Sequence, residues 1–101
     1  MFYFVKNKIM ETLSLTSDLY SKALSLERDS KYDEAIALYE SIIDIDETKI
    51  GSYIRLGELY ESNNLIIKAI STYKKGIVLA QKLRNKKAER FLSYILLGLI
   101  E

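Results

Sequence analysis

Apolar residues recur three and four positions apart through most of the chain, which is the spacing of one face of an α-helix. Segments with this pattern span residues 17–28, 32–45, 50–62, 65–83 and 88–100. Short polar breaks separate several of them, at Asp29-Ser30-Lys31, Asp46-Glu47-Thr48 and Asn63-Asn64. These residue types favour turns over regular structure. The pattern therefore predicts an all-α fold of five helices.

Side chains of similar size and polarity recur along the chain at one fixed spacing. The pairs are Leu19 and Tyr53, Ala23 and Gly57, Leu26 and Tyr60, Ala35 and Ala69, and Tyr39 and Tyr73. The spacing matches a period of about 34 residues, typical of a helix–turn–helix unit that cannot bury its apolar face alone and stacks on its neighbours. The chain is therefore predicted to be a short helical solenoid. Ala35 and Ala69 are expected to be buried where two helices pack closely.

The repeated residues resemble the signature of the tetratricopeptide-repeat (TPR) family, W-x2-L-G-x2-Y followed by A-x3-F. The second repeat reads Tyr53-x2-Leu56-Gly57-x2-Tyr60 and then Ala69-x3-Tyr73. The first repeat matches best in the run from Lys31 to Ile36, and a partial third match, Tyr94-x2-Leu97-Gly98, begins somewhat more than one period after Tyr53. The resemblance implies two TPR repeats plus a C-terminal capping helix, as in small standalone bacterial TPR proteins.

These patterns predict a TPR domain at residues 17–101, preceded by an N-terminal tail at residues 1–16. Repeat one is placed at 17–49, repeat two at 50–83 and the terminal helix at 88–101. Ser17 and Asp18 are favourable N-cap residues for the first helix. Its opening run, from Met1 to Lys8, is expected to be loose or strand-like. Met10 is a plausible alternative start, so residues 1–9 are expected to be dispensable for folding.

The composition excludes most catalytic chemistry. The chain has no histidine and no cysteine, so the usual nucleophile–base pairs and common zinc sites are excluded. It also lacks a glycine-rich phosphate loop. We therefore predict no catalytic residue, no metal site, no cofactor and no enzymatic activity. The absence of cysteine fits a reducing cytoplasm, and no apolar run approaches the length of a membrane span.

Charge is unevenly distributed along the chain, although the net charge is only +1. Residues 1–50 carry six positive and ten negative side chains, and residues 51–101 carry nine positive and four negative. The basic excess lies mainly between Lys74 and Arg90. Nucleic-acid-binding domains usually have a stronger overall basic balance. We therefore interpret this segment as a solvated helix face, and a nucleic-acid partner is not expected.

The resemblance also implies a concave groove lined by the first helix of each repeat. Carried over to this chain, the protein-binding groove comprises Tyr20, Leu24, Glu27, Ile54, Arg55, Glu58, Glu61 and Ile95. Family members that grip a C-terminal carboxylate use lysine and asparagine, and here only Arg55 matches a cationic position. An apolar peptide or helix is the expected ligand. The alternative is that Tyr20, Leu24 and Ile54 pack on neighbouring helices or on the N-terminal segment.

The last helix is apolar around most of its circumference, and such a helix is largely buried or meets a partner. This suggests an alternative function, a self-associating structural protein that dimerises through the terminal helix. The residues expected to mediate self-association are Leu92, Leu96, Leu99 and Ile100. The leading interpretation remains a non-enzymatic adaptor or scaffold for a protein or peptide partner.

Overall fold

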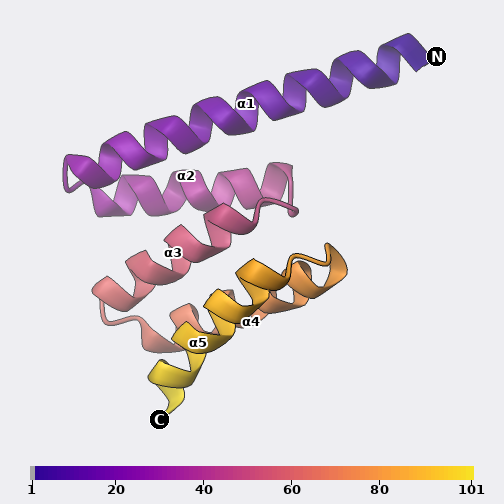
Figure 1. The fold of residues 1–101 in the computed structure, drawn as a ribbon. Helices are drawn as coiled ribbons and strands as arrows, with labels where there is room; N and C mark the ends of the chain where they lie inside the picture. Colours follow the sequence, from indigo (N-terminus) through magenta and orange to yellow (C-terminus); the bar gives the residue numbers. More distant parts are fainter. Residues whose placement is uncertain (1) are drawn as a thin grey trace. The chain divides into compact units, whose positions relative to one another are not determined.

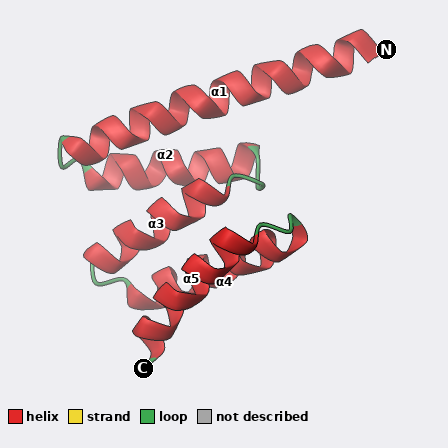
Figure 2. Cartoon of the chain, viewed as in Figure 1, coloured by secondary structure: helices red, strands yellow, loops and turns green. Residues whose placement is uncertain are grey.

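The computed structural model describes residues 2–101, with side chains from residue 8 onward, and it contains five helices and no strand over that range (Figures 1 and 2). The helices are α1 (Phe2–Arg28), α2 (Tyr32–Ile45), α3 (Ile50–Ser62), α4 (Ile66–Lys82) and α5 (Lys86–Ile100). The bounds of α2 and α3 coincide with the segments predicted from the apolar pattern. The all-α prediction is confirmed.

The helices form two compact units, Met1–Glu47 and Thr48–Glu101. In the first unit, α1 packs on α2 as an antiparallel hairpin (Figure 1). In the second unit, α4 packs on both α3 and α5. The α1–α2 and α3–α4 pairs match the helix–turn–helix organisation that the repeat period predicts.

The first helix is longer than the sequence pattern indicated. It begins at Phe2, so the prediction of a loose or strand-like run at residues 1–8 is wrong over the described residues 2–8, and the helix also includes residues 9–16 of the predicted tail. Ser17 and Asp18 lie inside α1 and do not cap it. The Thr12 hydroxyl donates to the Lys8 carbonyl oxygen at 3.0 Å, and the Thr16 hydroxyl donates to that of Thr12 at 3.0 Å. Both hydroxyls are thus satisfied within the helix, and no proline or glycine interrupts it.

Three of the four connections between helices have the same backbone conformation. Ser30, Asn64 and Arg84 each adopt a positive φ, of 61°, 61° and 55°. After each helix, one amide N–H spans back over five residues to a carbonyl oxygen, as in the 2.8 Å bond from Leu65 N to Tyr60 O. This is the Schellman pattern, which usually places glycine at the left-handed residue. The polar residues at these positions therefore end the helices by backbone geometry, without glycine.

The two repeats bury equivalent positions in the two units. Ala35 and Ala69 have no exposed surface, and neither do Tyr39 and Tyr73. The prediction that both alanines are buried is therefore confirmed. At its first helix, repeat one has the exposed Lys22 at the position of the buried Leu56 of repeat two. Other buried residues of the second unit are Ser52, Tyr53, Leu56, Gly57, Leu59, Tyr60, Thr72, Gly76, Ala80 and Leu92.

Candidate interaction surfaces

A tyrosine–glutamate hydrogen bond occurs once in each repeat, at equivalent positions of the two repeats. The Tyr39 hydroxyl donates to the Glu27 carboxylate, and the Tyr73 hydroxyl donates to Glu61 Oε2 at 2.5 Å. Each bond ties the end of the first helix of a repeat to the middle of its second helix. Glu27 and Glu61 are both residues of the predicted groove. The structure gives each of them an internal role that spacing alone did not reveal.

The environment of Tyr73 keeps its proton on the hydroxyl. Burial is the largest cause that raises the pKa of Tyr73 well above its ordinary value of 10.0, followed by the hydrogen bond to Glu61. The negative charges of Glu61 and Glu58 raise this pKa further. A buried phenolate beside two carboxylates would be strongly disfavoured. Tyr73 therefore remains a hydrogen-bond donor that holds the Glu61 carboxylate in place.

The first unit carries three residues of the predicted groove, Tyr20, Leu24 and Glu27. Tyr20 and Leu24 are half-buried. The ring of Tyr20 meets that of Tyr39 edge-on, with centroids 5.7 Å apart and an interplanar angle of 68°. Such edge-to-face pairs add about 0.5–1.5 kcal/mol to the energy of burial. Tyr20 therefore packs on the neighbouring helix α2, as the alternative interpretation anticipated, and still keeps part of its surface accessible.

The second unit carries the remaining five residues of the predicted groove. Ile54, Arg55, Glu58 and Glu61 follow one another along α3 at helical spacing, and Ile95 lies on α5. Glu58 is exposed, and the other four are half-buried. This face of α3 thus combines an apolar side chain, a guanidinium and two carboxylates, one of which Tyr73 fixes.

The terminal helix turns a different side outward from the one predicted for self-association. Leu92 has no exposed surface. A Cβ atom added at Gly76 would lie 3.0 Å from Leu92 Cδ1 and 3.3 Å from Tyr53 Cβ, so α4 approaches both neighbours closely at this glycine. Leu92 is therefore a core residue and is not available to a partner, which corrects its placement in the self-association set.

Of the other residues in that set, Leu96 and Leu99 are half-buried and Ile100 is 57% exposed. The most exposed large apolar side chain of α5 is Tyr94, and Phe91 and Leu97 are also exposed. The sequence carried a signal for this face. Tyr94 and Leu97 match the first-helix positions Tyr53 and Leu56, which are buried in the unit where α4 packs on α3.

Over the part of the chain that the structure describes, no group of three or more acidic side chains is placed to hold a metal ion. No helix of that part is long and apolar enough to cross a membrane.

Comparison with known proteins places the chain among helical repeat proteins. It is similar to a tetratricopeptide repeat domain protein from Salinibacter ruber in two solved structures, one by solution NMR and one by crystallography. Each solved structure is 28% identical to this chain, and each match covers 83% of this chain. The NMR structure has a TM-score of 0.80 and is covered over 85% of its length, and the crystal structure has a TM-score of 0.77 and is covered over 94%. No protein-family model matches the chain, and no curated protein matches it at a significant level. The chain is a TPR-like protein with an all-α repeat architecture, a class commonly used for protein interaction and typically without enzymatic activity.

Proposed function

We propose that this chain is a non-enzymatic protein-interaction module, an adaptor or scaffold of the cytoplasm, that binds a peptide or helix on the first-helix faces of its repeats. The observation that supports this most is the face of α3, where Ile54 lies beside Arg55, Glu58 and the Glu61 carboxylate held by Tyr73. A carboxylate fixed before binding loses less side-chain entropy when it pairs with a ligand.

The chemistry of this face defines the ligand. Ile54 offers apolar contact, and Glu58 and Glu61 offer two carboxylates within two turns of the same helix. An apolar peptide that also carries a basic side chain would satisfy both features. In the other unit, the accessible parts of Tyr20 and Leu24 offer a second apolar contact on α1.

Selection from a peptide library tests the proposal, followed by calorimetric titration of the selected peptides. The change Ile54→Glu is expected to weaken binding at least tenfold, because it places a third carboxylate at the apolar contact. The matched control is Ile67→Glu, at a site on α4 that is 85% exposed. Equal affinity of both variants for every selected peptide would contradict the proposal.

Self-association through α5 is the alternative function. The observation that favours it is the apolar surface of α5, including Ile100 at its end. Light scattering over a concentration series tests it, since a dimer has twice the monomer mass of 11.7 kDa. A constant monomer mass would remove this alternative.

A further inference from the structure

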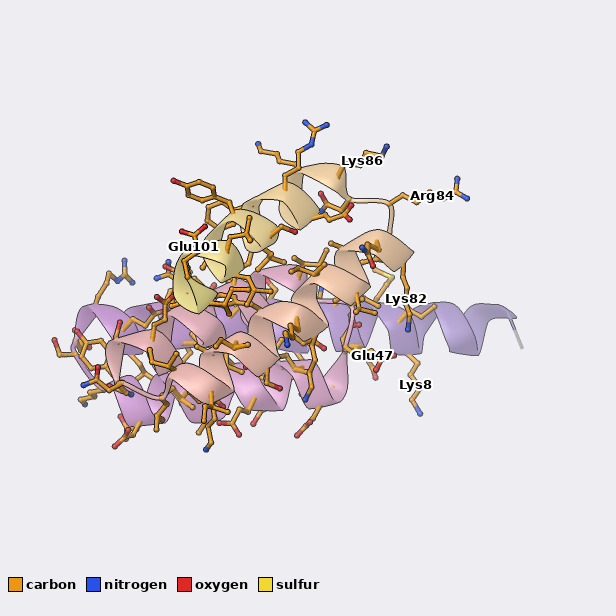
Figure 3. All side chains as sticks on the ribbon, turned by 90° about the horizontal axis from the view of Figure 1, so that it is seen from below. Lys8, Glu47, Lys82, Arg84, Lys86 and Glu101 are labelled. Atoms are coloured by element: carbon orange, nitrogen blue, oxygen red, sulfur yellow. The ribbon has the colours of Figure 1, made fainter. Side chains whose placement is uncertain are left out.

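One side of α5 is exposed along its whole length. Tyr94 and seven residues within about a quarter-turn of it, on a helix of 3.6 residues per turn, make up this side. The eight are Lys86, Lys87, Arg90, Phe91, Tyr94, Leu97, Gly98 and the C-cap residue Glu101, and all are exposed. Figure 3 shows Lys86 and Glu101 at opposite ends of the helix. We call this set the open face of α5. Leu92 lies on the opposite side, buried against α4.

The open face is the counterpart of a face that is covered elsewhere in the same unit. Tyr94, Leu97 and Gly98 repeat the spacing of Tyr53, Leu56 and Gly57. The three residues of α3 are buried in the unit where α4 packs on α3. Tyr94 and Leu97 are instead 79% and 55% exposed. The packing of α4 on α3 therefore indicates which kind of helix would fit on the open face of α5.

The two glycines show this difference at atomic scale. A Cβ atom built at Gly57 would lie 2.4 Å from Cε1 of Tyr73, so the tyrosine ring of α4 occupies the space above that glycine. A Cβ atom built at Gly98 meets nothing within 4 Å among the described residues. Gly98 thus leaves room for an aromatic ring that this unit does not supply.

Charge further restricts the occupant. Lys86, Lys87 and Arg90 lie at the N-terminal end of the open face, and a shallow hollow of about 510 Å³ runs from Lys86 and Arg90 to Tyr94 and Leu97. A helix that packs antiparallel, as α4 does on α3, would bring its C-terminal turns to these cations (Figure 1). Acidic side chains in those turns would be attracted to them.

We propose that the open face of α5 binds an amphipathic helix of another protein, one that has alanine or glycine four residues before an aromatic residue and acidic side chains in its C-terminal turns. The aromatic ring would lie over Gly98, as the ring of Tyr73 lies over Gly57. This surface is distinct from the α3 face of the proposed function.

A second copy of the chain fits this face less well than a partner helix. The small-x3-aromatic pattern occurs in α2, as Ala35 and Tyr39, and in α4, as Ala69 and Tyr73. All four side chains are already buried within their own units. A second copy that kept its fold would therefore expose no helix with the small-x3-aromatic pattern.

The chain itself supplies a suitable probe. A helix-stabilised peptide of residues 32–45 carries Ala35 and Tyr39, with Glu40 and Asp44 in its last turns and no basic side chain. Titration of this peptide into the full chain should give saturable binding that weakens as salt rises, because the cations of α5 are exposed. A peptide with Glu40→Lys and Asp44→Lys, and one with Tyr39→Ala, should each bind at least tenfold more weakly.

The variant Gly98→Leu provides the decisive control on the protein. It puts a side chain in the space that the ring would occupy, where a Cβ atom meets nothing within 4 Å among the described residues, and leucine favours helix more than glycine does. It should fold at least as well as the wild type and lose peptide binding at least tenfold. The matched control is Val78→Leu, at a half-exposed site on α4, which should bind like the wild type.

Amide chemical shifts locate the bound peptide. Shifts centred on Arg90, Tyr94 and Gly98 would support the proposal. Shifts centred on Ala23 and Tyr20 would overturn it, because the peptide would then be competing with α2 for α1. Undiminished binding to Gly98→Leu, or a dimer of the chain that Gly98→Leu abolishes, would also overturn it. None of these results tests the α3 surface, because that surface is tested by the weaker binding of its selected peptides to Ile54→Glu.

Discussion

At the scale of single residues, two glycines at equivalent repeat positions have opposite surroundings, and this predicts opposite effects of the same substitution. Gly57→Ala drives a methyl group into the ring of buried Tyr73. Overpacking of this kind costs about 1–3 kcal/mol, so the variant should be less stable than the wild type. Gly98→Ala has open space and gains helix propensity, up to about 1 kcal/mol. Urea unfolding of both variants checks the signs. A gain in both would show that the Tyr73 ring moves aside readily.

Tyr73 also makes stability depend on pH. Its pKa in the folded protein lies above the ordinary value of 10.0, so above pH 10 the unfolded chain loses this proton while the folded chain keeps it. The unfolded state then binds fewer protons, and the free energy of unfolding falls as pH rises, by up to about 1.4 kcal/mol per pH unit. Below pH 10 this contribution is fully present.

The test compares the wild type with Tyr73→Phe between pH 9 and about 11, a window just above the ordinary tyrosine pKa. Other tyrosines and lysines titrate in both proteins, so the informative quantity is the difference in slope. The variant should lose less stability per pH unit, although it is less stable at neutral pH because the bond to Glu61 is gone. Parallel pH profiles would show that Tyr73 ionises normally.

At the scale of the elements, α1, α3 and α4 each end at a non-glycine residue with a positive φ, and replacing such a residue by glycine should stabilise the fold. A non-glycine residue in this conformation costs roughly 1–2 kcal/mol, and asparagine tolerates it better than arginine. Arg84→Gly should therefore raise the free energy of unfolding by about 0.5–1 kcal/mol, and Asn64→Gly should raise it less. Thermal unfolding of the two variants beside Arg84→Ala gives the ranking, and a loss of stability in Arg84→Gly would contradict it.

The N-terminal part of α1 predicts a second element-scale result. Ile9, Met10, Leu13 and Leu15 are all exposed, and Thr16 is the first buried residue among those with described side chains. A chain that begins at Met10 should therefore keep the melting temperature of the full chain and lose only the helical signal of the missing turns. A drop of more than about 5 °C, roughly 1 kcal/mol for a domain of this size, would show that residues 1–9 contribute to packing.

At the scale of the whole molecule, the repeat made most of the fold predictable. The bounds of α2 and α3 follow from polar turns that flank strong apolar patterns, and the buried alanines follow from the repeat period. The start of α1 was missed, because Ser17 and Asp18 were interpreted as N-cap residues, although Val5, Ile9 and Leu13 already lie four positions apart upstream of them. The outward face of α5 was missed, because its apolar residues cover most of the helix circumference and the partial third match at Tyr94 and Leu97 was not used to orient it. In the structure Leu92 is buried beside Gly76, where a side chain on α4 would have no room.

The two units should differ in their ability to fold alone. The second unit, Thr48–Glu101, has three helices, and α4 is covered on both sides by α3 and α5. The first unit, Met1–Glu47, has two helices, and among its described side chains only Thr16, Ala23, Ala35, Tyr39 and Ile42 are buried. Domains near 55 residues are marginal but often fold alone, whereas a single helical hairpin rarely covers its apolar faces.

We therefore expect fragment 48–101 to show a cooperative thermal transition by circular dichroism, and fragment 1–47 to show weak helicity without one. Leu92→Ala is the matched control within the larger fragment. It opens a cavity where α5 meets α4 and should cost about 2–5 kcal/mol, enough to abolish the transition of a marginal domain. If fragment 48–101 is unfolded before that change is made, the contacts among α3, α4 and α5 are insufficient by themselves, and the stability of the chain belongs to the whole array.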